Sequence, residues 1–90
     1  MSDYERGTII VTVYSKTSTF CGQCMATKRA LNDLGVDYVE IPLENVGDAR
    51  IGAWRDSGHM SAPIVEIDEG GKTITQVWSG YRPDLIATLV

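Results

Sequence analysis

The feature that most constrains this chain is a pair of cysteines three positions apart, Cys21-Gly-Gln-Cys24, set between two runs of different periodicity. The preceding run, 8–14, is rich in β-branched and aromatic residues and predicts a buried strand. The following run predicts a helix over 22–34, ended by Gly35, because apolar residues recur at helical spacing at Met25, Ala26, Ala30, Leu31 and Leu34. The cysteines are therefore expected at the start of a helix, directly after a strand.

The chain has no other cysteine, which narrows what this pair can do. The loop that a Cys21–Cys24 disulfide closes is too short to stabilise the fold much. Zinc requires about four ligands, and the sequence adds only one distant histidine, His59. A metal bridged between two chains stays open as an alternative. The favoured interpretation is a redox-active dithiol.

The remaining sequence predicts an α/β domain of 1–90 with the order β-α-β-α-β-β-α. Further strands are expected at 37–41, 64–67 and 73–78, and further helices from Asn45 to about Ser57 and from Pro83 onward. The middle helix is expected to have Asn45 as its N-cap, Gly58 as its stop, and an apolar face of Val46, Ala49, Ala53 and Trp54.

The last two strands are expected to form a hairpin, because Asp68-Glu-Gly-Gly71 supplies adjacent glycines for a turn. The final helix is expected to use Leu85, Ile86, Leu89 and Val90 as its apolar face. The two strand–helix–strand crossovers predict parallel strand pairs.

The charge balance argues against two classes of partner. Eight Lys+Arg against twelve Asp+Glu give a net charge of −4. Proteins that bind nucleic acids usually carry a basic surface, and a negative net charge weakens attraction to anionic membranes. No apolar run approaches the roughly 18–20 residues of a membrane-spanning helix, and residues 1–7 contain no apolar signal-peptide region. A cytoplasmic protein is therefore expected.

Three motifs give the chain a resemblance to the thioredoxin superfamily, and within it to the NrdH-type redoxins. They are Gln23 inside the CxxC, the run Ala62-Pro63-Ile64-Val65, and the run Trp78-Ser79-Gly80-Tyr81-Arg82-Pro83-Asp84. These redoxins are small proteins that look like glutaredoxins in sequence and behave like thioredoxins. The resemblance implies a thioredoxin fold, with a four-stranded mixed sheet flanked by three helices.

The position of the motif predicts different roles for its two cysteines. Cys21, at the N-terminus of a helix, would meet unpaired backbone N–H groups and the positive end of the helix dipole, which favour a thiolate. Cys21 is therefore expected to be the nucleophile. Cys24, three residues later and further inward, is expected to resolve the mixed disulfide between Cys21 and a partner.

The resemblance also implies partners. Such redoxins donate electrons to class Ib ribonucleotide reductase and are reduced by an NADPH-dependent thioredoxin reductase, acting as monomers without a bound cofactor or metal. Three alternatives stay open: a glutathione-dependent dithiol glutaredoxin, an iron–sulfur or metal-carrying dimer, and a redox-inert interaction module. A glutathione site would need cations and a turn near the last helix to hold the carboxylates of the tripeptide.

The resemblance assigns further residues to the site. Gln23 is expected to tune the sulfurs through hydrogen bonds, with a solvated side chain as the alternative. Gly22 stands where members of the family usually carry a bulkier apolar residue; it is expected to tune the site by letting a partner approach the nucleophile closely, with an eased turn as an equal alternative. The Ala62–Pro63 bond is expected to be cis, with Ala62 presenting its backbone to an incoming segment. The partner groove is expected to comprise Phe20, Ala62, Pro63, Ser79, Gly80 and Tyr81. The loop beside it is expected to be organised by Trp78, Arg82 and Asp84.

Several residues have equally simple structural explanations. Phe20 serves equally well as an aromatic cap on the core, and Asp84 as an ordinary acid in the first turn of a helix. Trp54 is expected in the core, and His59 in a surface loop without a catalytic role. Lys16 is expected to be solvated. Asp68 and Glu69 are expected to contribute only solubility.

Overall fold

The computed structural model describes residues 9–70 and 73–90. The strands are β1 (Ile9–Ser15), β2 (Val39–Pro42), β3 (Ile64–Glu69) and β4 (Thr73–Ser79). The helices are α2 (Gly22–Asp33), α3 (Asp48–Asp56) and α4 (Pro83–Ile86), with short 3-10 helices at Leu43–Asn45 and Ala87–Leu89. The predicted element order is therefore confirmed. Residues 1–7, Thr8 at the expected start of the first strand, and Gly71 of the expected hairpin turn lie outside the described residues.

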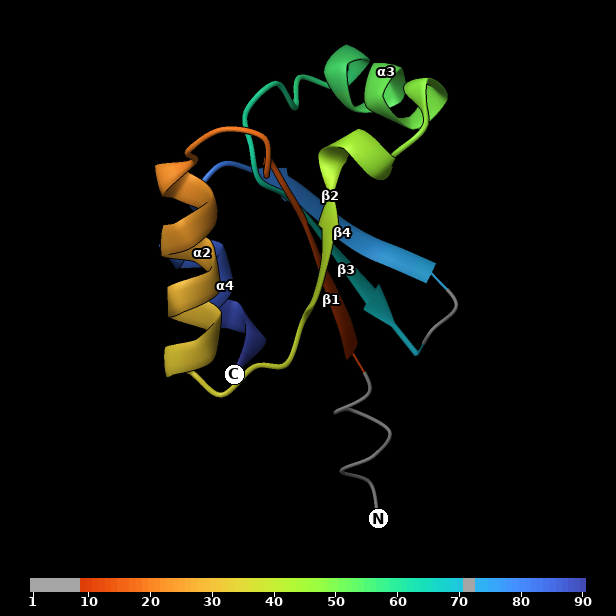
Figure 1. Ribbon diagram of the computed structural model, residues 1–90. Helices are drawn as coiled ribbons and strands as arrows, with labels where there is room; N and C mark the ends of the chain where they lie inside the picture. The colour runs from red at the N-terminus through yellow and green to blue at the C-terminus, as the bar shows by residue number, and fades with distance from the viewer. Residues whose placement is uncertain (1–8, 71–72) are drawn as a thin grey trace.

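The four strands form one mixed sheet in the order β2-β1-β3-β4 (Figure 1). β2 lies parallel to β1, whereas β3 is antiparallel to both β1 and β4. The mixed sheet and the closing hairpin are as predicted, and Gly70 supplies the positive φ of the turn at +74°.

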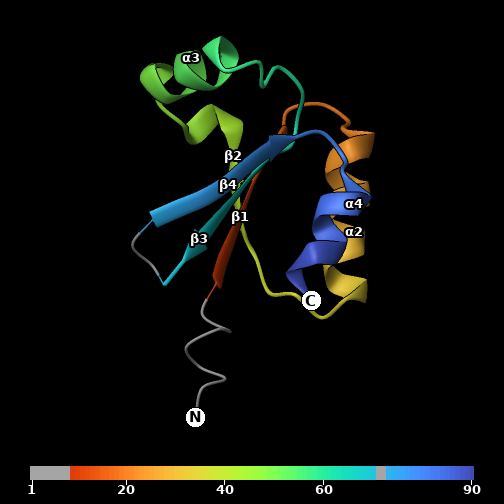
Figure 2. The same ribbon diagram turned by 180° about the vertical axis from the view of Figure 1, so that it is seen from behind.

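The expectation that both crossovers join parallel strands is wrong for the second. A crossover helix makes the next strand parallel only if it runs back along the whole sheet. α3 has nine residues, or about 13.5 Å at 1.5 Å per residue. It lies at the end of the sheet where β1 and β2 finish (Figures 1 and 2). β3 therefore starts at that end and runs in the opposite direction.

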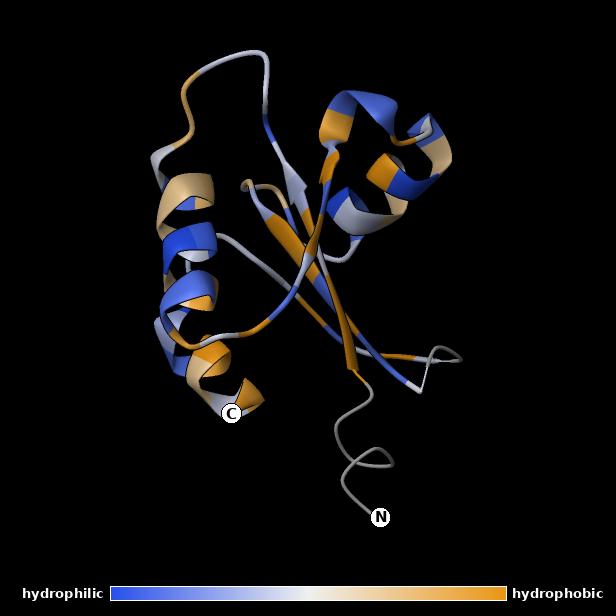
Figure 3. Cartoon of the chain, turned by 60° about the horizontal axis from the view of Figure 1, so that its bottom comes forward, coloured by the Kyte–Doolittle hydropathy of each residue, from blue (hydrophilic) through white to orange (hydrophobic). Residues whose placement is uncertain are grey.

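Two hydrophobic clusters hold the layers together. α2 and α4 lie on the same side of the sheet (Figure 2), and the larger cluster fills the space between them and the strands. Its buried members are Val11, Val13, Leu31, Val65, Ile67, Trp78 and Ile86. On the other face, Trp54 of α3 packs with Tyr14 and Ile64, which confirms Trp54 as a core residue. The strands are accordingly rich in apolar residues (Figure 3).

Several predicted helix faces are wrong. In α2 the buried residues are Cys24, Thr27 and Leu31, while Met25 and Leu34 are 52% and 43% exposed. The side of α2 that carries these three residues faces inward, which leaves the larger Met25 on the exposed side.

The middle and last helices also depart from the predicted pattern. Asn45 lies in a 3-10 helix, so the N-cap of α3 is Gly47. α3 ends at Asp56, and Gly58 follows with a φ of +91°, as expected of a helix stop. Ala49 and Ala53 are exposed, because this part of the chain packs through Ile51 and Trp54 of α3 and through Val46, which precedes the helix. Val90 is exposed, whereas Ile86 is buried.

The sheet register brings three loops to one end of the molecule. Tyr14 at the end of β1 pairs with Ile64 at the start of β3, and Ile64 pairs with Ser79 at the end of β4. The loops 16–21, 57–63 and 80–82 therefore adjoin one another. None of the helices in the described residues is long and apolar enough to cross a membrane.

Candidate active site

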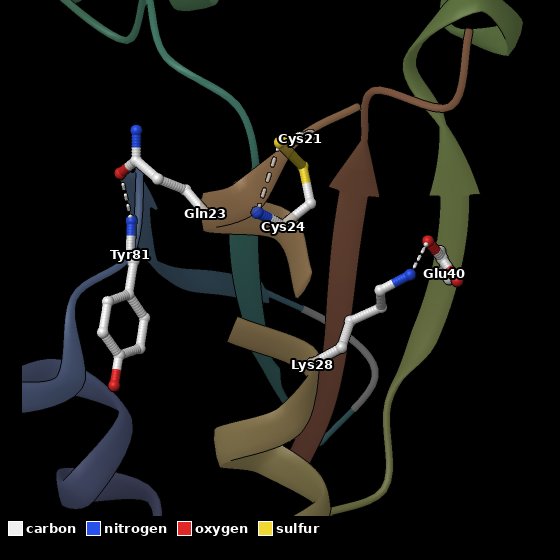
Figure 4. Close-up of a disulfide and its surroundings, with 6 residues drawn as sticks. All are labelled: Cys21, Gln23, Cys24, Lys28, Glu40 and Tyr81. Carbon is white, nitrogen blue, oxygen red and sulfur yellow. Dashed lines mark hydrogen bonds and ion pairs between the residues drawn. A yellow bond between two sulfur atoms is a disulfide. The ribbon is translucent and has the colours of Figure 1, made fainter. Parts of the chain in front are cut away.

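A disulfide joins Cys21 and Cys24 at the first turn of α2, with their Cα atoms 5.3 Å apart. Cys21 is the N-cap residue of the helix, and the Cys24 N–H donates a hydrogen bond to its Sγ at 3.2 Å (Figure 4). The first turn of α2 contains no acidic residue. A thiolate at Cys21 would therefore meet backbone N–H groups and the helix dipole without an opposing carboxylate in that turn.

The two sulfur-bearing residues differ in accessibility. Cys21 is partly exposed, whereas Cys24 is only 2% exposed. A bulky disulfide substrate can therefore reach Cys21 from solvent but not Cys24. Gly22, the first residue of α2, keeps this approach open: a Cβ built there would meet only the Phe20 ring, at 3.5 Å.

An open groove of about 300 Å³ lies over Cys21. It is lined by Lys16, Phe20, Cys21, Gly22, Gln23, Met60, Ser61 and Ala62. Phe20 and Met60 present large apolar surfaces, being 82% and 76% exposed. The first of these values rules out Phe20 as a cap on the core. A second cavity of about 290 Å³ continues from this groove towards α3, sharing Lys16, Met60, Ser61 and Ala62 with it.

The Ala62–Pro63 peptide bond is cis, as expected. Ala62 is half-buried and borders the groove, while Pro63 is buried beneath it. The Gly80 N–H donates a hydrogen bond to the Pro63 carbonyl at 2.8 Å. The loop after β4 is thereby tied to the loop that borders the sulfurs.

Gln23 connects the CxxC motif to the same loop. Its Oε1 accepts a hydrogen bond from the Tyr81 N–H at 2.8 Å, across 58 positions of sequence (Figure 4). Gly80 has a φ of +78°, and a Cβ there would lie 2.8 Å from Gln23 Oε1. A residue with a side chain would be strained at this position by the backbone conformation, and its Cβ would force the Gln23 amide to move.

The residues that follow form a separate local arrangement. The Arg82 guanidinium donates two hydrogen bonds to the Asp84 carboxylate, at 3.2 and 2.9 Å. This interaction lowers the pKa of Asp84 and raises the pKa of Arg82. Trp78 is buried in the core at the end of β4. Ser79 is half-buried, and its Oγ lies 3.3 Å from His59 Nδ1.

Sequence reasoning missed part of the groove. His59 lies in the loop after α3, as expected, but it is half-buried and lines the second cavity. Met60 and Ser61 were not singled out, although both line the cavities. The only available signal was their position directly before Ala62-Pro63. Lys16 is exposed but borders both cavities, and Asp68 and Glu69 lie at the far end of β3.

Within residues 9–70 and 73–90, no three His, Cys, Asp or Glu side chains gather to hold a metal ion. The two sulfurs of Cys21 and Cys24 can carry out thiol–disulfide exchange.

Comparison with known proteins gives a consistent result. Residues 11–71 match the glutaredoxin family. The glutaredoxin-like protein NrdH of Escherichia coli strain K12 is 35% identical over 79 residues, which cover 88% of this chain and 86% of that protein. Its counterpart in Salmonella typhimurium strain LT2 is 33% identical over the same share.

The solved structure of NrdH-redoxin from Escherichia coli, a glutaredoxin-like protein with a thioredoxin-like activity profile, has a TM-score of 0.69 and 34% identity. The match covers 90% of this chain and 95% of that one. A mitochondrial thioredoxin 3 from Saccharomyces cerevisiae shares the fold, with a TM-score of 0.60 at 16% identity. A thioredoxin fold with a CxxC pair at the start of α2 and a close relationship to NrdH places this chain in the glutaredoxin family, among the NrdH-type glutaredoxin-like thiol–disulfide oxidoreductases.

Proposed function

We propose that this redoxin donates electrons to class Ib ribonucleotide reductase and is itself reduced by an NADPH-dependent thioredoxin reductase. It acts as a cytoplasmic monomer, in a compartment that keeps its dithiol reduced. The relationship to NrdH and the thioredoxin-like activity profile of the Escherichia coli protein support this assignment.

The chemistry proceeds through one mixed disulfide. The Cys21 thiolate attacks a disulfide of the oxidised partner and releases one partner thiol. The Cys24 sulfur then attacks Cys21, which releases the second partner thiol and leaves the Cys21–Cys24 disulfide. The reductase returns two electrons and two protons to this disulfide and so completes the cycle.

The groove beside Cys21 has the character of a docking surface for a protein segment. Phe20 and Met60 offer apolar contacts at its rim. Ala62 and the cis-Pro63 present backbone from one side, and the loop Ser79–Gly80–Tyr81 borders the first turn of α2 through the Gln23 contact. We propose that an extended partner segment lies across Ala62 as an added strand. In this proposal Gly22 and Gln23 tune access and loop position, and Trp78, Arg82 and Asp84 hold the loop.

The single observation that best supports thioredoxin reductase over glutathione is the hydrogen bond between Gln23 and Tyr81. A glutathione site would need a turn near the last helix to hold a carboxylate. Here the backbone N–H of Tyr81 in that turn already donates to Gln23 Oε1. To bind this N–H, a carboxylate of glutathione would have to displace Gln23 Oε1, which already accepts its hydrogen bond within the same chain.

The test is NADPH consumption with the oxidised protein. Thioredoxin reductase is compared with glutathione plus glutathione reductase, and Cys21→Ser serves as the blank. We expect turnover with thioredoxin reductase and none with glutathione. Turnover with glutathione alone would contradict the proposal and identify a glutathione-dependent glutaredoxin.

The second half of the proposal needs its own experiment. Oxidised class Ib ribonucleotide reductase is supplied with this redoxin, thioredoxin reductase and NADPH, and deoxynucleotide formation is measured. Omitting the redoxin should abolish multiple turnovers. Replacing it with Cys24→Ser should also abolish them, because the mixed disulfide would not be resolved.

A further inference from the structure

Thr27 carries a hydroxyl for which the disulfide form of the fold provides no partner. Its side chain is fully buried, and among the described residues Oγ1 makes no hydrogen bond. Buried hydroxyls are nearly always paired, and a threonine in a helix commonly bonds to a carbonyl one turn earlier. The unpaired atom lies one helical turn after Cys24 and calls for a specific explanation.

Cys24 and Thr27 are neighbours on the same face of α2. Residues three apart on a helix have Cβ atoms roughly 5–6 Å apart. Helical side chains tilt towards the N-terminus, so the Thr27 side chain leans towards the turn that contains Cys24. Both residues are buried on the face of α2 that packs against the sheet. In the present form the Cys24 sulfur is bonded to Cys21 and carries neither a proton nor a charge.

We propose that the Thr27 hydroxyl donates a hydrogen bond to the Cys24 sulfur once the disulfide has opened, and so stabilises the thiolate that resolves the mixed disulfide. In this proposal the Thr27 hydroxyl, which has no partner in the oxidised form, becomes the hydrogen-bond donor to the Cys24 sulfur in the reduced form. The inference concerns a step internal to the redoxin and does not depend on which proteins supply or accept the electrons.

Resolution of the mixed disulfide by Cys24 exchanges one S–S bond for another. Cys24 loses its proton to solvent, and its sulfur attacks Cys21 Sγ of the Cys21–S–S–partner disulfide. The Cys24–Cys21 bond forms, and the bond between Cys21 and the partner sulfur breaks. The electron pair leaves on the partner sulfur, which takes up a proton from solvent. The partner is reduced and the redoxin is oxidised.

Cys24 needs such a donor more than Cys21 does. Burial in apolar surroundings raises the pKa of a thiol, and Cys24 is 2% exposed. The Cys24 N–H points to the Cys21 sulfur and does not serve Cys24 itself. Lys28 of α2 is paired with Glu40 of β2, and Arg82 is paired with Asp84 of α4, while Lys16 borders the groove over Cys21.

The experiment uses the reduced full chain and the chromogenic disulfide 5,5′-dithiobis(2-nitrobenzoate), followed by stopped flow. Attack by Cys21 releases the first chromophore, and resolution by Cys24 releases the second. Thr27→Val removes the hydroxyl at constant shape. We expect it to slow the second release about 10- to 100-fold at neutral pH, to move its pH midpoint upward by about one to two units, and to leave the first release unchanged. Thr27→Ser keeps the hydroxyl and should restore the second release.

Three outcomes would overturn the proposal. The first is a second release by Thr27→Val with the rate and pH midpoint of the parent. The second is a Thr27→Ser variant as slow as Thr27→Val, which would point to the lost methyl contact. The third is a large loss of thermal stability in oxidised Thr27→Val. Such a loss would mean that the hydroxyl already makes a hydrogen bond in the oxidised form, whereas the proposal requires that it makes none.

Discussion

Gln23 Oε1 and the Tyr81 N–H, 58 positions apart in the chain, lie 2.8 Å apart in the fold. This hydrogen bond joins the CxxC motif, in which Gln23 directly precedes Cys24, to the loop after β4. A Cβ at position 80 would lie 2.8 Å from the same oxygen, so glycine leaves the space that the Gln23 amide occupies.

Gly80→Ala should therefore destabilise the protein by more than its backbone conformation requires. A positive φ costs a residue with a side chain about 1–2 kcal/mol, and the contact with Gln23 adds to that cost. Gly35→Ala is the matched control, since Gly35 has a φ of +73° but no atom within 4 Å of its would-be Cβ. Chemical denaturation should show a larger loss for Gly80→Ala than for Gly35→Ala.

The additional loss of stability of Gly80→Ala over Gly35→Ala should disappear when each is combined with Gln23→Ala, because the amide that a Cβ at position 80 would contact is then gone. If Gly80→Ala loses equally more stability than Gly35→Ala with and without Gln23→Ala, the contact with Gln23 is not the cause of the additional loss.

The two cysteines should behave differently when each is replaced in turn. Cys24→Ser should form a stable mixed disulfide with an oxidised protein partner, because Cys21 is accessible and nothing resolves the bond. Cys21→Ser should form almost none, because Cys24 is 2% exposed. Non-reducing electrophoresis and mass spectrometry measure the adducts. Abundant adduct with Cys21→Ser would reverse the assigned roles.

The ion pair between Lys28 of α2 and Glu40 of β2 should make stability depend on pH. Lys28 Nζ donates to Glu40 Oε2 at 2.8 Å and lowers the pKa of that carboxyl from its usual 4.5. A lowered carboxyl pKa contributes stability above the unfolded-state pKa, and this contribution is lost as the pH falls through the folded-state value. Glu40→Gln should cost roughly 0.3–1 kcal/mol near pH 7 for this partly exposed pair.

The cost of Glu40→Gln should shrink as the pH falls below the usual 4.5 of the carboxyl, and it should vanish once the pH has passed below the lowered folded-state pKa of Glu40, because the parent carboxyl is then protonated. Thermal unfolding of parent and variant across this range at low salt measures it. Glu69→Gln, an exposed carboxylate at the far end of β3, is the control. A difference that does not shrink as the pH falls below 4.5 would contradict the pairing.

Arg50 should be essential for the attachment of α3 to the sheet. Its guanidinium donates to Glu66 Oε2 and, at 3.1 Å, to the Tyr14 hydroxyl, and it lies 4.8 Å from the Trp54 ring centre. Glu66 is only 6% exposed. Arg50→Met would leave this carboxylate without its cation and should cost about 1–3 kcal/mol, discounted because Arg50 itself is half-exposed.

Glu66→Gln combined with Arg50→Met should recover part of this loss, because the buried charge is removed. Chemical denaturation of the single and double variants measures the recovery. Additive losses would show that the two side chains act independently.

The sequence alone indicated much of the architecture. Strand and helix periodicities predicted the element order, and the positions of Gly35, Gly58 and Pro83 marked helix ends that the fold retains. These features are local, since backbone preferences and side-chain spacing act within a few residues. The family motifs led to the mixed sheet and the cis bond before Pro63, which local patterns alone do not specify.

The same local patterns failed where packing selects among compatible arrangements. Met25 and Leu34 match a helical apolar stripe, yet α2 buries Cys24, Thr27 and Leu31, because the packing of the whole domain decides which face of the helix turns inward. The direction of β3 depended on where α3 lies, and nine residues of helix do not encode that position.

The sequence by itself determined that two cysteines stand at the start of a helix after a strand, because that follows from spacing. The tertiary structure alone decided that Gln23 meets Tyr81, that Met60 borders the groove over Cys21, and that His59 lines the second cavity. These contacts join segments distant in the chain, and the sheet register that brings their loops together is set by the packing of the whole domain.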